Sequence, residues 1–157
     1  MASIVKNLIE YSGLADTLPT NPLYFKQLSV QENLSIPDAK PDVEQIIKVM
    51  AQVIITSTRV ITTPVARSLE GQILTGWKLI VEGELQQKVE YVGDLPTQPV
   101  HAAEFNIPFS TFIVLPASFI TGTPIIVTGY IEDIYIEQIS ARDMFKNVTL
   151  LLNATIG

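Results

Sequence analysis

A strict alternation of apolar and polar residues between Lys78 and Val92 constrains the fold more than any other feature of the chain. In an extended strand, successive side chains point to opposite faces of a sheet. A period of two over this length therefore predicts a β-strand with one buried and one solvated face. The residues expected to face inward are Leu79, Val81, Leu85, Val89 and Tyr91, and those expected to face outward are Lys78, Glu82, Glu84, Gln86, Lys88 and Glu90.

Strand signals of this kind recur along most of the sequence. Ile, Val and Thr, whose stiff side chains suit a pleated sheet, supply 48 of the 157 residues, and no strong helical period follows residue 50. We therefore predict an all-β fold, an antiparallel β-sandwich or an open barrel, with about six to eight strands. The further strand-like runs are 23–36, 49–63, 104–110, 124–139 and 148–156.

Four local features refine this expectation. Pro108 cannot donate to a ladder, so its strand is expected at a sheet edge or at a bulge. The apolar phase changes within 124–139, which a bulge near Gly129 would explain. Asp42 could cap one helical turn ending at Ile47, and residues 64–76 are expected to form a loop with Gly71 in its turn.

The first 22 residues differ from the rest and are interpreted as an N-terminal arm and linker, followed by a β domain over 23–157. The arm has two open alternatives. Ser3 could cap a short helix with apolar residues at i, i+4 spacing, or the segment could be extended. Two prolines in 18–22 then interrupt regular structure. The apolar arm residues are Ile4, Val5, Leu8 and Ile9.

Composition and charge exclude several classes of partner. The net charge of −6 and the absence of a basic patch argue against nucleic acid and anionic membrane surfaces. The N-terminus lacks the pattern of a signal peptide and no apolar run could span a membrane, so we expect synthesis in the cytoplasm and no membrane span. Only 17% of residues are charged, which indicates either surface covered by neighbouring subunits or a surface rich in Thr, Asn and Gln.

The side chains that could carry chemistry do not form a recognisable site. Cys is absent, and His101 is the only histidine, which we expect at a strand entry with a hydrogen bond to the backbone. Glu82, Glu84 and Glu90 alternate with lysines, as on a solvated sheet face, and the acidic group Glu132, Asp133 and Glu137 lacks the pattern of a calcium loop. We therefore expect no catalytic residue, no cofactor and no metal, and interpret the protein as not an enzyme.

Two stretches together resemble the SPOCS domain of sporulation and spore-coat proteins. The first, Gln31–Ile47, reads QENLSIPDAKPDVEQII. The second begins at Leu74 with LTGWKLIVEGEL and continues through Tyr91-Val92, PTQPVH (96–101) and FNIPFS (105–110). The resemblance covers roughly residues 24–157, and it is the ordered set of short pieces that makes it specific.

The resemblance implies a protein of spore-forming Firmicutes, from a family with which no catalytic activity is associated. Its best-known members carry tandem SPOCS units followed by a LysM module linked to partner binding, and they attach or assemble the spore envelope by binding the coat-base ATPase. This chain has one SPOCS-like unit and no LysM tail, which fits a self-assembling subunit better than an attachment factor.

These observations lead to one functional prediction and one alternative. We expect a non-catalytic structural protein that forms a homo-oligomer or filament at the spore surface or coat, with Ile4, Val5, Leu8 and Ile9 docking onto a neighbouring subunit. Other spore-coat proteins are further candidate partners. The alternative is an adaptor that recognises a spore-coat protein or a cell-wall glycan through an exposed loop such as 64–76. Symmetry, and the choice between coat layer and appendage, stay open.

Overall fold

Eight strands build the protein, whose computed structural model describes residues 2–157. The described residues contain no helix, and hence none that could cross a membrane. The strands are β1 (Ala2–Lys6), β2 (Ile9–Leu14), β3 (Tyr24–Ser35), β4 (Val43–Arg67), β5 (Ile73–Gly93), β6 (Val100–Val114), β7 (Ile125–Gln138) and β8 (Asp143–Ile156).

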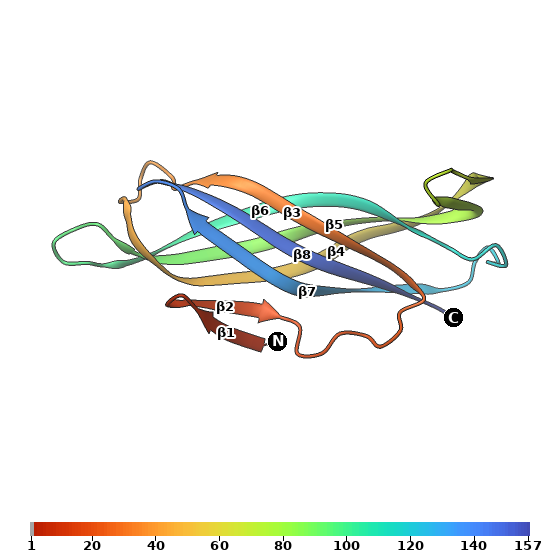
Figure 1. Cartoon of the computed structure of the whole chain (residues 1–157), viewed down its shortest axis with the longest axis horizontal. Coiled ribbons are helices and arrows are strands. Elements are labelled where there is room, and N and C mark those ends of the chain that lie inside the picture. Colours follow the sequence, from red (N-terminus) through yellow and green to blue (C-terminus); the bar gives the residue numbers. More distant parts are fainter. Residues whose placement is uncertain (1) are drawn as a thin grey trace.

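The strands form two sheets that face each other as a sandwich, drawn out along one axis (Figure 1). The larger sheet has the order β1-β2-β4-β5-β6, and the smaller has the order β3-β8-β7. Neighbouring strands are antiparallel except β2 and β4, which run parallel where Glu10–Ser12 meets Lys48–Met50. The predicted all-β sandwich is therefore confirmed, and it is the sandwich alternative that the chain adopts.

The central strand of the larger sheet is β5, as its alternation requires. Its inner residues Leu79, Val81, Leu85, Val89 and Tyr91 are all at most 1% exposed, because the smaller sheet covers that face. On one side β5 pairs with β4, and on the other with β6, which is an edge strand. Pro108 lies in β6 opposite Glu84, so the expectation that its strand is an edge is confirmed.

The core has two parts that follow each other along the sandwich. One part lies at the end that carries β1 and β2 and includes Tyr11, Leu85, Tyr91 and Leu150. The other lies towards the opposite end and includes Leu79, Ile113, Phe119 and Leu152. Between them the sheets approach closely at Gly129 in β7, where an added Cβ would lie 2.4 Å from Val53 Cγ1 of β4. A larger side chain there would push the two sheets apart.

The N-terminal arm is extended, and the short helix considered for it is wrong. Asn7 and Leu8 both have positive φ, 53° and 66°, and so form a two-residue turn that reverses the chain between β1 and β2. The spacing of Ile4, Val5, Leu8 and Ile9 resembled a helix because the turn falls between the two apolar pairs. Pairing of β2 with β4 then gives the backbone partners that a short isolated helix would lack.

Three other local expectations need correction. Residues 42–47 contain no helical turn, because Val43, Ile46 and Val49 share the buried face through two register shifts in β4 that mimic a period of three. Most of the expected loop 64–76 is strand, since β4 continues to Arg67 and β5 begins at Ile73. The phase change in β7 does come from a bulge, but the bulge lies between Ile131 and Asp133 rather than at Gly129.

Candidate functional site

The N-terminal arm closes the sandwich along the seam between β4 and β7. The backbone of β2 pairs with β4, and Ala15 N–H then donates to the carbonyl of Ile131 in β7 at 2.9 Å. Tyr11 and Leu14 are buried in this seam and belong to the core. Burial, and next the neighbouring Tyr135 and Asp133 of β7, raise the pKa of Tyr11. The seam-filling segment, Ile9–Ala15, therefore joins the two sheets on this side.

Gly13 permits the close contact between the arm and β4. Its φ is +105°, and a Cβ at this position would lie 1.9 Å from the carbonyl oxygen of Ala51. Any other residue would need both an unfavourable backbone conformation and a retreat of the arm from β4. The position of this glycine therefore determines how deeply the arm sits in the seam.

The four proposed interface residues do not share one environment. Ile4, Val5 and Leu8 are 47%, 73% and 83% exposed, while Ile9 is half-buried and packs against the core. The first three lie on or beside β1, which forms one edge of the larger sheet and has β2 as its only printed partner among the described strands. The structure thus brings Ile4, Val5 and Leu8 together as an exposed apolar edge and assigns Ile9 to the chain's own core.

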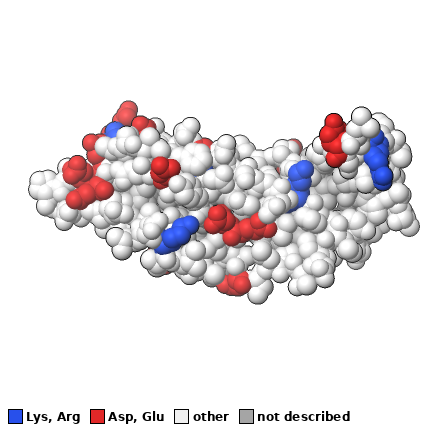
Figure 2. Space-filling view, in the orientation of Figure 1, with Lys and Arg blue, Asp and Glu red and all other residues white. Residues whose placement is uncertain are grey.

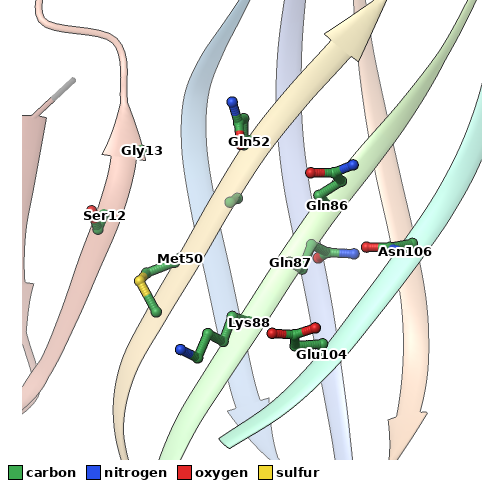
Figure 3. Close-up of a pocket in the computed structure, with 10 residues that line it drawn as sticks. Ser12, Gly13, Met50, Gln52, Gln86, Gln87, Lys88, Glu104 and Asn106 are labelled. Atoms are coloured by element: carbon green, nitrogen blue, oxygen red, sulfur yellow. The ribbon is translucent and has the colours of Figure 1, made fainter. Parts of the chain in front are cut away.

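A polar groove of about 550 Å³ crosses the outer face of the larger sheet (Figure 3). Two rows of side chains run across the strands there. Gln52, Gln86 and Asn106 form one row from β4 to β6, and Ser12, Met50, Lys88 and Glu104 form the next row from β2 to β6. Amides and one residue of each charge offer hydrogen-bond donors and acceptors in an open setting, which suits reversible binding of a polar molecule.

The surface is sparsely charged, and most of the face seen in Figure 2 carries no charged side chain. Where charges lie close on the larger sheet they are balanced: Lys48 is 3.9 Å from Glu10, and Lys88 is 3.8 Å from Glu90. Both pairs are partly exposed and hold few kilocalories in water. The glutamates considered as a carboxylate pair thus lie beside lysines on a solvated face.

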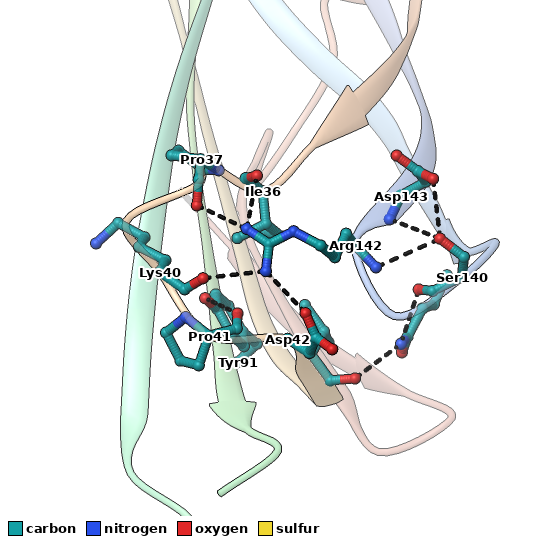
Figure 4. A network of polar contacts seen from close by, with 11 residues as sticks. Ile36, Pro37, Lys40, Pro41, Asp42, Tyr91, Ser140, Arg142 and Asp143 are labelled. Atoms are coloured by element: carbon teal, nitrogen blue, oxygen red, sulfur yellow. Dashed lines mark hydrogen bonds and ion pairs between the residues drawn. The ribbon is translucent and has the colours of Figure 1, made fainter.

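Arg142 holds the conserved-looking segment at one end of the sandwich in place (Figure 4). Its guanidinium donates to the carbonyls of Ile36, Pro37 and Lys40 at 2.8–3.1 Å and to the Asp42 carboxylate at 2.8 Å. The fixed fork of five N–H groups suits this multiple contact. Arg142 thereby connects the SIPDAKPD loop, which follows β3, to the turn before β8.

Two further groups complete this polar network. The Tyr91 hydroxyl donates to the carbonyl of Pro41 at 2.9 Å, so the core strand β5 supports the loop from below. Ser35 and Ser140 donate to the Asp143 carboxylate, and these hydrogen bonds hold the pKa of Asp143 below its ordinary value. The network is structural in its contacts, since each partner is a backbone carbonyl or a side chain of the same loops.

The sandwich interior contains one lysine. Lys146 of β8 is 1% exposed, and its Nζ has no hydrogen-bond partner among residues 2–157. Burial lowers the pKa of Lys146 to about 7, and Glu32 acts in the opposite direction. Glu32 lies opposite Lys146 in the β3–β8 ladder, and its carboxylate accepts a hydrogen bond from Gln87 at 3.1 Å. Burial raises the pKa of Glu32.

The remaining candidate residues are dispersed. His101 begins β6 beside Tyr91, with ring centroids 5.9 Å apart, and its buried Nε2 lacks a partner in the described chain, so the expected backbone hydrogen bond is not made by that nitrogen. Glu132, Asp133 and Glu137 follow one another along β7. In residues 2–157, no group of three or more His, Asp or Glu side chains is placed to hold a metal ion.

Sequence reasoning missed Lys146 and Arg142, for different reasons. Lys146 has a visible signal, because it shares the inward phase of Met144 and Val148 in the last strand. Extending the alternation two residues back from Val148 would have revealed a buried lysine. Arg142 has no such signal, since its partners lie about a hundred residues earlier in the chain.

The comparisons with known proteins bear on the region between these features. The family model described as "SipL, SPOCS domain" matches residues 42–139, which is more than half of the chain. The chain belongs to the SPOCS-domain family. The matched part of this SPOCS domain runs from Asp42, a partner of Arg142, through β4, β5, β6 and β7. No curated protein and no solved structure matched.

Membership in this family indicates a role related to sporulation. The expected resemblance is confirmed for the region that contains the long β4–β5 hairpin and the outer groove. The N-terminal arm, β3 and β8 lie outside the matched residues. Evidence for what the arm does must therefore come from its own contacts.

Proposed function

We propose that this SPOCS-domain protein is a non-catalytic structural subunit that self-assembles into an oligomer or filament associated with the bacterial spore or its envelope. The observation that carries the proposal is the open edge of β1, with Ile4, Val5 and Leu8 exposed along it. An edge strand offers unpaired backbone groups that a second chain can use, and apolar side chains add to the contact. The scarcity of surface charge removes a common obstacle to such association.

The edge of β1 is well suited to strand addition because it is not blocked. It contains no proline and one charged residue, Lys6. Natural proteins commonly protect such edges with charges, prolines or bulges. At the opposite edge of the same sheet, β6 carries Pro108, which interrupts the row of donors there. The two edges thus differ, and a contact that uses one of them in each copy is heterologous, which gives rings or fibres.

A single backbone substitution tests this proposal. Lys6 and Ile9 flank the two-residue turn and pair with each other, so the alternation of an antiparallel ladder directs the N–H of Val5 to the open side. We expect Val5→Pro to remove this donor, leave the β1–β2 ladder in place and abolish assembly, as followed by light scattering and negative-stain electron microscopy.

Two matched variants separate the backbone from the side chain. Val5→Thr keeps the β-branched shape and the N–H, so it should assemble, though more weakly than the native chain. Ile120→Ser changes an equally exposed isoleucine, 73% exposed in the loop between β6 and β7, and should assemble normally. Assembly of Val5→Pro at the native level, or a native chain that stays monomeric at high concentration, would refute the proposal.

The outer groove favours a second candidate function, an adaptor that binds a spore-coat protein or a cell-wall glycan. Its row of amides, Gln52, Gln86 and Asn106, could hydrogen-bond the hydroxyl and acetamido groups of a glycan. Titration with soluble peptidoglycan fragments, comparing the native chain with Gln86→Ala, tests this alternative. Equal binding by both proteins, or no binding by either, would exclude the groove as a glycan site.

A further inference from the structure

The seam between β4 and β7 must be filled for the sandwich to bury its core, and the filling segment is supplied by the arm. Tyr11 and Leu14 enter the core there, beside Val49 and Ile131, which are themselves buried. Without the seam-filling segment these apolar side chains would meet water. Each SPOCS domain of this type therefore needs an arm in its seam, but the contacts do not require that the arm come from the same chain.

The contacts that hold the arm are confined to a short piece of it. They comprise the parallel ladder of Glu10–Ser12 with β4, the side chains of Tyr11 and Leu14, and the hydrogen bond from Ala15 to Ile131. After Ala15 the chain becomes a linker that reaches β3 at Tyr24, with Pro19 and Pro22 in it. In Figure 1 the linker runs along the molecule from the arm to the end where β3 begins.

The length of the linker allows the arm to reach a second body. Nine residues, 15–23, span roughly 30 Å when extended, about the width of a small domain. From Asp16 to Leu18 all three residues are exposed, so the linker lies on the surface rather than in the core. Prolines stiffen such a segment and favour an extended course over a return to the same body.

We propose that in the assembled protein the arm in each seam belongs to a neighbouring copy of the same chain. This inference rests on the proposed self-assembly and specifies its contact. The exchanged arm makes the same ladder with β4, the same burial of Tyr11 and Leu14 and the same bond to Ile131, so the exchange loses no contact in the seam. The arm also carries β1 with it, which places the exposed edge of Ile4, Val5 and Leu8 at the junction of two copies.

The balance between the two arrangements depends on protein concentration. In a single chain the linker holds the arm near its own seam at an effective concentration on the order of millimolar. Exchange overcomes this advantage only when chains are concentrated or when the β1 edge gains contacts between copies. A dilute protein should therefore keep its arm at home, and a concentrated one should form linked chains of copies.

The absence of cysteine from the chain allows a direct test. Ser12 of β2 and Met50 of β4 are partners in the parallel ladder, and both line the outer groove (Figure 3). One chain carrying Ser12→Cys is mixed with another carrying Met50→Cys, assembled at high concentration and oxidised. We expect a covalent dimer on a non-reducing gel, because only an exchanged arm brings these two residues together.

A double variant provides the internal standard. Ser12→Cys with Met50→Cys in one chain should give a cross-linked monomer when dilute and a ladder of covalent multimers when assembled. A pair within the β3–β8 ladder, Ser29→Cys with Thr149→Cys, should remain an intrachain bond under both conditions. A short bis-maleimide replaces oxidation if the dilute double variant fails to form its disulfide.

The outcomes separate this inference from the proposal on which it rests. Assemblies whose cross-links are all within one chain would refute arm exchange while leaving self-assembly intact. A chain that never assembles would refute both. Covalent multimers from the double variant together with dimers from the mixed single variants would establish that the arm passes between copies.

Discussion

Replacement of the buried Lys146 by methionine should make the protein more stable and remove a pH dependence. The pKa of Lys146 is lowered from 10.5 to about 7 by burial. Each pKa unit corresponds to about 1.4 kcal/mol, so holding the charged form in the core costs up to about 5 kcal/mol. Methionine has a similar length without the charge, and such replacements are commonly neutral or stabilising by about 1–4 kcal/mol. We expect Lys146→Met to fall within that range at pH 6.

The sign of the pH dependence follows from proton binding. Below about pH 7 Lys146 carries a proton in both the folded and the unfolded chain, so the full cost applies. Between about pH 7 and 10.5 the unfolded chain binds a proton that the folded chain lacks, so the free energy of unfolding rises with pH by up to about 1.4 kcal/mol per unit. The raised pKa of Glu32 acts in the acidic range, where stability falls as pH rises through that pKa.

Urea denaturation between pH 6 and 9, followed by the fluorescence of the single tryptophan, Trp77, measures this effect. The difference between the native and Lys146→Met profiles cancels the contributions of other titrating groups and should shrink as pH rises. Lys48→Met, a partly exposed lysine on the outer sheet face, is the control and should leave the slope unchanged. Parallel profiles for the native chain and Lys146→Met would refute the reasoning, because they would show that Lys146 reaches water or a charged partner.

Two other substitutions test the contacts that organise the fold. Gly13→Ala would place a Cβ 1.9 Å from the Ala51 carbonyl oxygen at a φ of +105°, so we expect a loss of about 2 kcal/mol or more in urea denaturation; Gly122→Ala, at a φ of +90° with open space around it, isolates the backbone cost. Arg142→Lys keeps the charge but loses the fork that reaches three carbonyls and Asp42, so we expect about 2 kcal/mol of destabilisation, and an effect no larger than that of Arg59→Lys on the exposed part of β4 would contradict the role given to the guanidinium.

The elements that could be predicted from sequence are those whose periodicity is regular. The alternation in β5 identified its inner face correctly, and Pro108 correctly marked β6 as an edge strand. Irregular strands were harder, because a bulge changes the spacing of buried residues. In β4 two register shifts gave Val43, Ile46 and Val49 a spacing that imitated a helix.

The candidate site was only partly accessible in the same way. Ile4, Val5 and Leu8 could be selected as apolar residues in a polar-flanked arm, and they are indeed exposed. Ile9, chosen with them, packs into the chain's own core, since β2 and not β1 enters the seam. The groove on the outer face joins four strands that are far apart in sequence, and no local pattern could assemble it.

The sequence by itself determined the class of fold and the family, because both follow from local properties. β-branched residues with a period of two require strands with one buried face, and ordered short motifs identify the SPOCS domain. Only the tertiary structure decided where the arm docks, what Arg142 holds and that Lys146 is buried. Each of these depends on strands brought together from distant parts of the chain, and which faces become covered is a property of the packed sheets rather than of any one strand.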